Sequence, residues 1–269
     1  MMRRRFSIGL RFSLSLAGGA LGCGGGAGPE PATTPSPLQR SAEGVSPQQV
    51  DSLWRLAESR VRQGKWGDAL KHLERALLEF APGDPRAARA RYYVGEAHFA
   101  LGNHLQAARE FRRVSDETPN DPLAPEALLR AGDVYADLWR RPELDPSYGQ
   151  TSLATYQELL NRYPGGSVAA RAQERIDDLR ERFAYKEYRA ALYYFRLKAY
   201  DSAILYLKDL VATYPRADIA PEALIKLVQA YSRLGYREDV QETCGYIRRF
   251  HPRAPGAGEV CPPVTAGAS

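Results

Sequence analysis

The histidines and carboxylates of this 269-residue chain lack the spacing that a catalytic or metal site needs. No two of the four histidines stand four positions apart around a glutamate, as in a zinc protease. Neither a Gly-Lys-Ser/Thr phosphate loop nor a Gly-x-Ser-x-Gly nucleophile turn occurs. The carboxylates of Asp177 and Asp178 alternate with arginines, which is typical of a solvated helix face. We therefore expect no catalytic residues, no metal and no enzyme activity.

Cys23 has neighbours that suit covalent lipidation. It follows Ala20-Leu21-Gly22, which resembles the lipobox where bacterial lipoproteins are cut and lipidated. A basic stretch from Arg3 to Arg11 and an apolar stretch from Phe12 to Gly22 precede it, and the apolar stretch is too short to span a bilayer. Residues 1–22 are thus predicted to be a lipoprotein export signal. The usual leucine of the lipobox is Ala20 here, so an ordinary signal peptide with an incidental Cys23 is the alternative. The lipid is the only expected cofactor.

The net charge of +5 is concentrated in this leader. Residues 1–22 hold four of the 37 basic residues and no acidic one, which leaves 33 basic against 32 acidic residues. A nearly neutral mature chain has no electrostatic footprint for nucleic acid, which we exclude as a partner. Residues 23–45 are rich in Gly, Pro, Ser and Thr and predict a flexible linker behind the lipidated cysteine.

Two further cysteines, Cys244 and Cys261, would share an oxidising compartment after export. Cys244 occupies the register of a large apolar residue in earlier units, so one interpretation is a small buried core residue. The other is a disulfide that pins the C-terminal tail to the last helix pair. The sequence leaves both open.

Recurring prolines divide the chain into units. Pro82, Pro119, Pro164, Pro215 and Pro252 are separated by 37, 45, 51 and 37 residues. Proline cannot continue a helix, and the residue before it leaves the α region. Five units that each end in a helix stop are therefore predicted across residues 46–252, followed by a Pro/Gly-rich tail at 253–269.

Each unit has the pattern of two amphipathic helices. In the second unit, Gly95 and Ala107 are small residues where two helices are expected to cross. This order of small residues, aromatics and turns is that of the tetratricopeptide repeat (TPR), and it predicts an all-α solenoid of about ten helices. The third unit has a longer loop around Arg141 to Pro146, and Ser167 to Leu197 predicts one long helix without Gly or Pro.

A second stripe on the first helix of each unit predicts a binding groove. Positions i, i+4 and i+7 share one helix face. The two leading trios are Trp54, Glu58 and Val61, then Tyr92, Glu96 and Phe99. We expect Trp54 and Tyr92 to be exposed anchors outside the core. The alternative is that the apolar members, Val61 and Phe99 above all, pack against the next unit.

Taken together, residues 23 to about 252 resemble the BamD family, TPR lipoproteins of the outer-membrane β-barrel assembly machinery. The resemblance rests on Cys23, the five units, the third-unit loop ending in Asp145-Pro146, and the segment from Leu179 to Tyr188. It implies a lipid-anchored protein at the periplasmic face of the outer membrane. Its implied partners are the soluble domains of a BamA-like barrel-assembly subunit and unfolded outer-membrane proteins.

The resemblance also gives the groove an implied ligand. Family members are associated with an extended substrate segment, and Arg62 and Arg89 would meet its terminal carboxylate. The rival interpretation is another periplasmic TPR adaptor lipoprotein, for cell-wall or pilus assembly, and the long helix from Ser167 to Leu197 argues against it. An enzyme regulated by a TPR module would need a second domain, which the repeat pattern does not leave room for.

Overall fold

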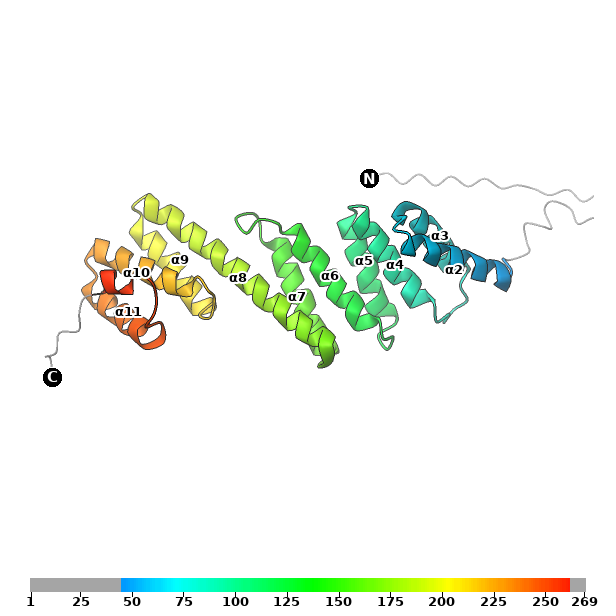
Figure 1. Ribbon diagram of the computed structural model, residues 1–269. Coiled ribbons are helices and arrows are strands. Elements are labelled where there is room, and N and C mark those ends of the chain that lie inside the picture. Colours follow the sequence, from blue (N-terminus) through cyan, green and yellow to red (C-terminus); the bar gives the residue numbers. More distant parts are fainter. Residues whose placement is uncertain (1–44, 262–269) are drawn as a thin grey trace, which may run out of the picture. The chain divides into compact units, whose positions relative to one another are not determined.

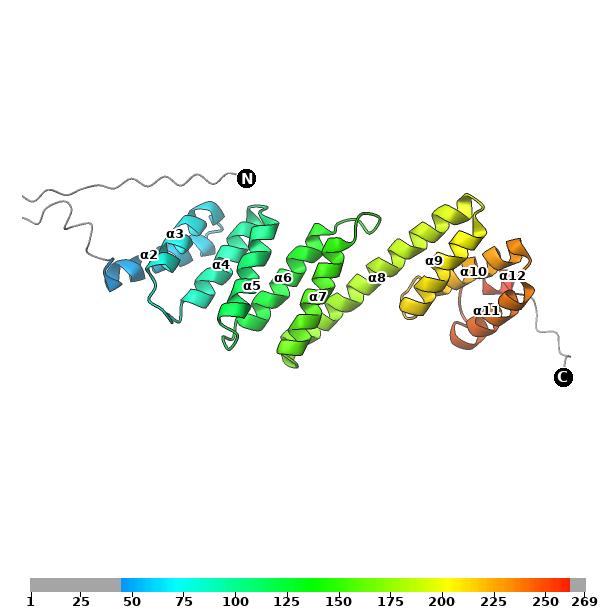
Figure 2. The ribbon, with the colours of Figure 1, turned by 180° about the vertical axis from the view of Figure 1, so that it is seen from behind.

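A computed structural model describes residues 45–261, and within that range every regular element is an α-helix (Figures 1 and 2). The helices are α2 (Pro47–Arg62), α3 (Trp66–Glu79), α4 (Ala87–Ala100), α5 (His104–Glu117), α6 (Ala124–Leu138), α7 (Ser147–Arg162), α8 (Gly166–Arg196), α9 (Tyr200–Thr213), α10 (Ala220–Leu234), α11 (Arg237–Phe250) and α12 (Ala257–Val260). The predicted all-α fold of paired helices is confirmed for this part of the chain. The expected export signal at residues 1–22 and Cys23 lie outside the described residues.

The helices begin and end where local sequence chemistry predicts. Ser46 caps α2 through a capping box, in which its Oγ accepts from the backbone N–H of Gln49 and the Gln49 side chain accepts from the backbone N–H of Ser46. The second helix of each later pair ends just before a proline. The backbone of the C-capping residues Thr118, Tyr163 and Tyr214 has left the helical region there.

Small residues allow the two helices of a pair to approach closely. The Cβ of an alanine at Gly95 on α4 would lie 2.7 Å from the Phe111 ring on α5. An alanine at Gly132 on α6 would likewise overlap the ring of Tyr156 on α7. Ala107 is fully buried in the same crossing as Gly95. The predicted role of Gly95 and Ala107 at a helix crossing is confirmed.

The 31-residue helix α8 is the first helix of the fourth pair, and it connects the third pair to its own partner α9. Its first half packs on α7 and α6 through residues such as Ile176 and Leu179. Its second half packs on α9 through Tyr188 and Ala191. Tyr214, which follows the last residue of α9, contacts both the apolar cluster around Ile176 and Leu179 and the one around Tyr188 and Ala191. Figures 1 and 2 show α8 and its neighbouring helices from opposite sides. The predicted long helix is confirmed with bounds one residue from those expected.

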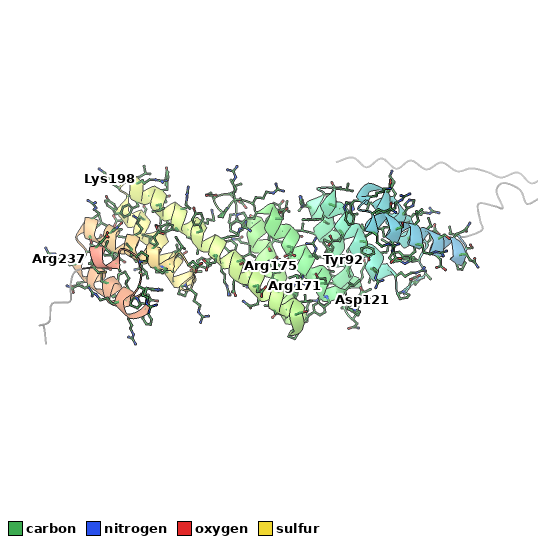
Figure 3. All side chains as sticks on the ribbon, in the orientation of Figure 1. Tyr92, Asp121, Arg171, Arg175, Lys198 and Arg237 are labelled. Carbon is green, nitrogen blue, oxygen red and sulfur yellow. A yellow bond between two sulfur atoms is a disulfide. The ribbon has the colours of Figure 1, made fainter. Side chains whose placement is uncertain are left out.

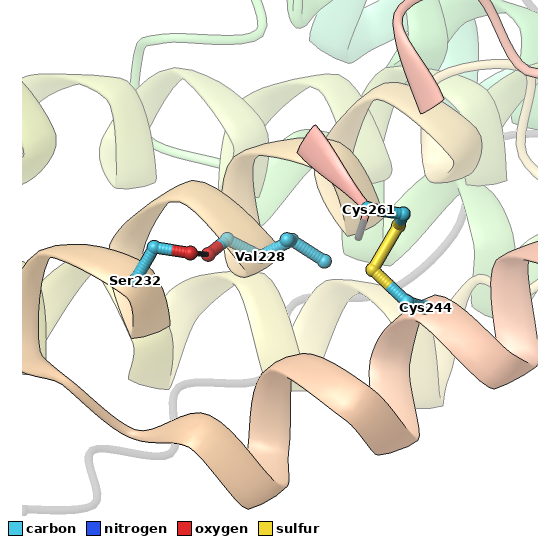
Figure 4. The surroundings of a disulfide bond; sticks show 4 residues. All are labelled: Val228, Ser232, Cys244 and Cys261. Atoms are coloured by element: carbon cyan, nitrogen blue, oxygen red, sulfur yellow. Dashed lines mark hydrogen bonds between the residues drawn. A yellow bond between two sulfur atoms is a disulfide. The ribbon is translucent and has the colours of Figure 1, made fainter. Parts of the chain in front are cut away.

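A disulfide joins α11 to the segment after α12 (Figure 4). Cys244 is fully buried, and its Cα lies 5.5 Å from that of Cys261. The bond belongs to an apolar cluster that includes Val228 of α10 and Ile247 of α11, with Val260 of α12 packed against it. Cys244 is thus a core residue and a bonded residue at once, and α12 covers the last pair.

Within residues 45–261, none of the helices combines the length and the apolar character that crossing a bilayer requires.

Candidate functional site

Trp54 belongs to the core, and the expectation of an exposed anchor is wrong for this residue. Its indole is only 8% exposed and stacks on Tyr93 of α4 at a ring-centroid distance of 6.3 Å. It also meets the ring of Phe80 edge-on at 6.0 Å. Tyr93 belongs to the second unit, which therefore covers the stripe of α2 that the sequence pattern predicts to be exposed.

An edge of Trp54 nevertheless reaches a cavity of about 370 Å³. The cavity is also lined by Arg86 and by Arg89, whose side chain is exposed, as well as by Asp121 and its neighbours before α6. Arg86 has compensating carboxylates, because it donates to Asp84 at 2.6 Å and to Asp51 at 2.7 Å. The pKa of Asp84 is held below its usual value by this side-chain hydrogen bond. Arg89 is the cation of the cavity without such a carboxylate contact among the described residues.

The other predicted residues of α2 are not brought to this cavity. Arg62 lies exposed in the last turn of α2, and Glu58 is partly buried one turn before it. Neither lines the cavity that Trp54 and Arg89 share. The structure thus joins two of the predicted groove residues and separates Arg62 from Arg89.

Tyr92, Glu96 and Phe99 lie on one stripe of α4, and α6 covers part of it. Tyr92 is half-buried, with its ring edge-on to Phe111 at 5.3 Å, and burial raises its pKa well above the usual value. Glu96 accepts two hydrogen bonds from Arg130 of α6, from Nε at 2.8 Å and from Nη2 at 3.1 Å. The same guanidinium lies 5.1 Å from the centre of the Phe99 ring. These contacts connect the second unit to the third. For Phe99 they agree with the alternative interpretation, in which its ring packs against the next unit.

Charged pairs of this kind recur along the first helices. Arg171 of α8 pairs with Glu126 of α6 at 2.8 Å, and Arg175 of α8 contacts Asp133 of α6 at 3.2 Å. Figure 3 labels Tyr92, Arg171 and Arg175 on these helices. Helices α4, α6 and α8 therefore share one surface on which most charges are already paired between units.

Between α6 and α8 this surface is hollowed by two adjoining cavities of about 600 and 400 Å³. Both are lined by Ala136, Tyr156, Arg175 and Arg182. The hydroxyl of Tyr156 donates to Asp133 at 2.7 Å, and burial together with this carboxylate raises the pKa of Tyr156. We call these two cavities the α6–α8 groove.

Arg182 differs from the other arginines of the α6–α8 groove. Its guanidinium lies 4.6 Å from the centre of the Trp139 ring and donates to the carbonyl oxygen of Ala136 at 3.4 Å. Burial lowers the pKa of Arg182, since no carboxylate contact offsets the desolvation. The sequence pattern marks the segment Leu179 to Tyr188 without assigning Arg182 to a groove. The signal that it missed is Trp139, an aromatic residue in the third-unit loop that forms the floor under Arg182.

The chemical character of the α6–α8 groove follows from the residues that line it. Its lining mixes apolar surface with oriented donors and acceptors, as protein-binding surfaces do. Among residues 45–261, no group of three or more His, Cys, Asp or Glu side chains is arranged to hold a metal ion.

Comparison with known proteins identifies relatives across most of this helical region. The family model YfiO, described as an outer membrane lipoprotein, matches residues 47–245. The outer membrane protein assembly factor BamD of Vibrio cholerae is 32% identical over 201 residues, which cover 71% of this chain and 83% of the relative. The protein of the same name from Caulobacter vibrioides is 24% identical over 192 residues, which cover 71% of this chain. Those residues span 63% of the Caulobacter relative, less than two thirds of its length.

Among solved structures, a TPR protein of Thermus thermophilus is 20% identical, and the match covers 78% of this chain and 95% of that one. Its TM-score is 0.35, a superposition too loose to add to the fold described above.

Proposed function

Because the chain belongs to the BamD family of outer-membrane protein assembly factors, we propose that it is a protein-binding scaffold for the assembly of outer-membrane β-barrels. In this role it docks on the BamA-like barrel-assembly subunit and helps to recognise unfolded β-barrel proteins. The observation that carries the proposal is the family match over residues 47–245, which runs from the first residue of α2 into α11 and includes the long helix α8.

The described surface supports a role in binding other proteins. The α6–α8 groove and the cavity beside Trp54 lie on the first helices of successive units, where solenoid proteins commonly bind extended partners. We propose that the protein acts through such contacts and catalyses no reaction.

We further propose that a lipid on Cys23 anchors the protein to the periplasmic face of the outer membrane. Cys23 and the linker behind it motivate this proposal, because several acyl chains on one residue anchor a protein stably. Replacing Cys23 with serine should move the protein from the membrane to the soluble periplasmic fraction. Fractionation should be repeated after the membranes are washed with high salt, which removes a protein held only by a charged partner. A Cys23→Ser variant that stays on salt-washed membranes contradicts the lipid anchor.

Co-purification from detergent-solubilised membranes tests the assembly role. A tagged full chain should recover a β-barrel subunit that carries soluble periplasmic domains. Recovery of a peptidoglycan synthase or a pilus subunit in its place would overturn the proposal in favour of another periplasmic adaptor. Because the detergent dissolves the membrane, co-purification does not depend on the anchor.

A further inference from the structure

The α6–α8 groove contains one partly buried cation that the described residues do not neutralise. Arg182 contacts the Trp139 ring and the carbonyl oxygen of Ala136, and neither carries a negative charge. A guanidinium that loses water without gaining a carboxylate is an unfavourable arrangement for the protein alone. Directly beneath it, the buried indole N–H of Trp139 has no acceptor among residues 45–261. The guanidinium of Arg182 therefore keeps hydrogen-bond donors that no anion among the described residues uses.

The other charged residues that line the groove have partners of their own. Asp178, one helical turn before Arg182, lies 3.9 Å from Arg175. Arg175 pairs with Asp133, and Arg130 with Glu96. Arg140, at the rim, lies 3.7 Å from Asp137. The acid next to Arg182 in the sequence does not serve it either. Its carboxylate, on Glu181, accepts a hydrogen bond from the backbone N–H of Asp218 at 2.9 Å.

We propose that Arg182 binds a carboxylate of an extended polypeptide that lies in the α6–α8 groove. This inference rests on the proposed role as a scaffold for other polypeptides, and it names the chemistry of one contact. The planar guanidinium is held by its stacking on Trp139, so its donor edge is oriented before a ligand arrives. Arg182 lines both of the adjoining cavities, so a polypeptide in either one lies next to this residue. The carboxylate belongs either to a free C-terminus or to an Asp or Glu side chain.

Titration calorimetry with three unlabelled peptides tests the contact. The first is a short unstructured Ser/Tyr peptide with a free C-terminus, the second is its C-terminal amide, and the third is that amide with a central glutamate. The wild-type full chain should bind at least one carboxylate-bearing peptide about tenfold more tightly than the plain amide, as expected for a hydrogen-bonded charge contact. Preference for the first peptide indicates a C-terminus, and preference for the third indicates a side chain.

Variants of α8 attribute the preference to one residue. Arg182→Gln should abolish it, and Arg182→Lys should retain only part, because lysine keeps the charge and loses the planar fork. Arg189→Gln is the matched control, since Arg189 is an exposed arginine on the same helix that lies over Tyr185. Circular dichroism of each variant should show unchanged helicity.

Equal affinity of the wild type for all three peptides, or no detectable binding of any, overturns the proposal. So does a preference that survives in Arg182→Gln. These outcomes are independent of the proposed function, because co-purification with a barrel subunit does not use the peptides. If the peptide preference depends on Arg182 but the protein recovers no barrel subunit, the carboxylate site is supported and the assembly role is contradicted.

Discussion

Replacing Cys261 with serine should destabilise the C-terminal helix pair by about 3 kcal/mol, as expected for opening a loop of this length. The disulfide to Cys244 closes a loop with a sequence separation of 17 residues. Its loss raises the conformational entropy of the unfolded segment and releases α12 from the apolar cluster around Val228 and Ile247. Cys261 is only partly buried, so the serine itself adds little cost. The buried thiol of Cys244 keeps its packing in this variant, which isolates the effect of the covalent link.

The loss should be local. In a solenoid each unit contacts its neighbours alone, so a change at the end of the array weakens the end first. Amide hydrogen exchange should therefore speed up in α11 and α12 by roughly two orders of magnitude, which is the equivalent of 3 kcal/mol. Exchange in α4 and α5 should stay as in the wild type, which makes these helices the internal control. The wild type treated with a reductant should behave as the variant does.

Intact mass decides whether the bond forms. Alkylation without reductant should leave both Cys244 and Cys261 of the wild type unmodified, and alkylation after reduction should modify both. Two alkylated thiols without reductant would refute the disulfide. Unchanged exchange in α11 after reduction would refute the argument that the bond stabilises this end.

Three further changes probe the core and its charges. Trp54→Ala should lower the free energy of unfolding by about 3 kcal/mol because it leaves a cavity in a buried cluster, and a urea midpoint equal to that of the wild type would restore the exposed-anchor interpretation. Gly132→Ala should cost about 1–3 kcal/mol through overlap with Tyr156, and the thermal midpoint of the double variant with Tyr156→Leu should show partial recovery. Asp84 has a depressed pKa in the folded state, so its pairing with Arg86 stabilises the protein above the unfolded pKa of about 3.9 and is lost as the pH falls through the folded value. Urea midpoints of Asp84→Asn should consequently fall less steeply than those of the wild type on acidification below about pH 5, and parallel curves would contradict this.

The helix boundaries could be predicted because the forces that set them are local. A proline acts on its own residue and the one before it, so Pro119 and Pro164 fix the ends of α5 and α7 without help from distant parts of the chain. The uninterrupted helix α8 follows from the absence of Gly and Pro between Ser167 and Leu197. The loop before α7 follows from the presence of Pro142 and Pro146. Glycines beneath aromatic rings, as at Gly95, follow from the register of a repeat.

The surface residues could not be predicted in the same way, because their neighbours come from another unit. Helical periodicity places Trp54 and Glu96 on corresponding stripes of α2 and α4, yet it does not say what covers either stripe. Tyr93 covers Trp54 from the second unit, and Arg130 binds Glu96 from the third, 34 positions along the chain. Exposure in a solenoid depends on the side chains of the next repeat, which a pattern within one repeat does not contain.

Contacts between units also distinguish Arg182 from the other cations of this surface. In the sequence it is one arginine among many, beside Arg180, which pairs with Asp177 three positions away at 3.1 Å. Pairs between neighbouring units neutralise Arg130 and Arg175, and such pairs hold the array together. Arg182 adds no such ion pair: it contacts the Trp139 ring and the carbonyl oxygen of Ala136, and burial lowers its pKa. A ligand that supplies the missing negative charge would offset this desolvation, which is why a peptide carboxylate, and not a further pair within the fold, is the partner that we assign to Arg182.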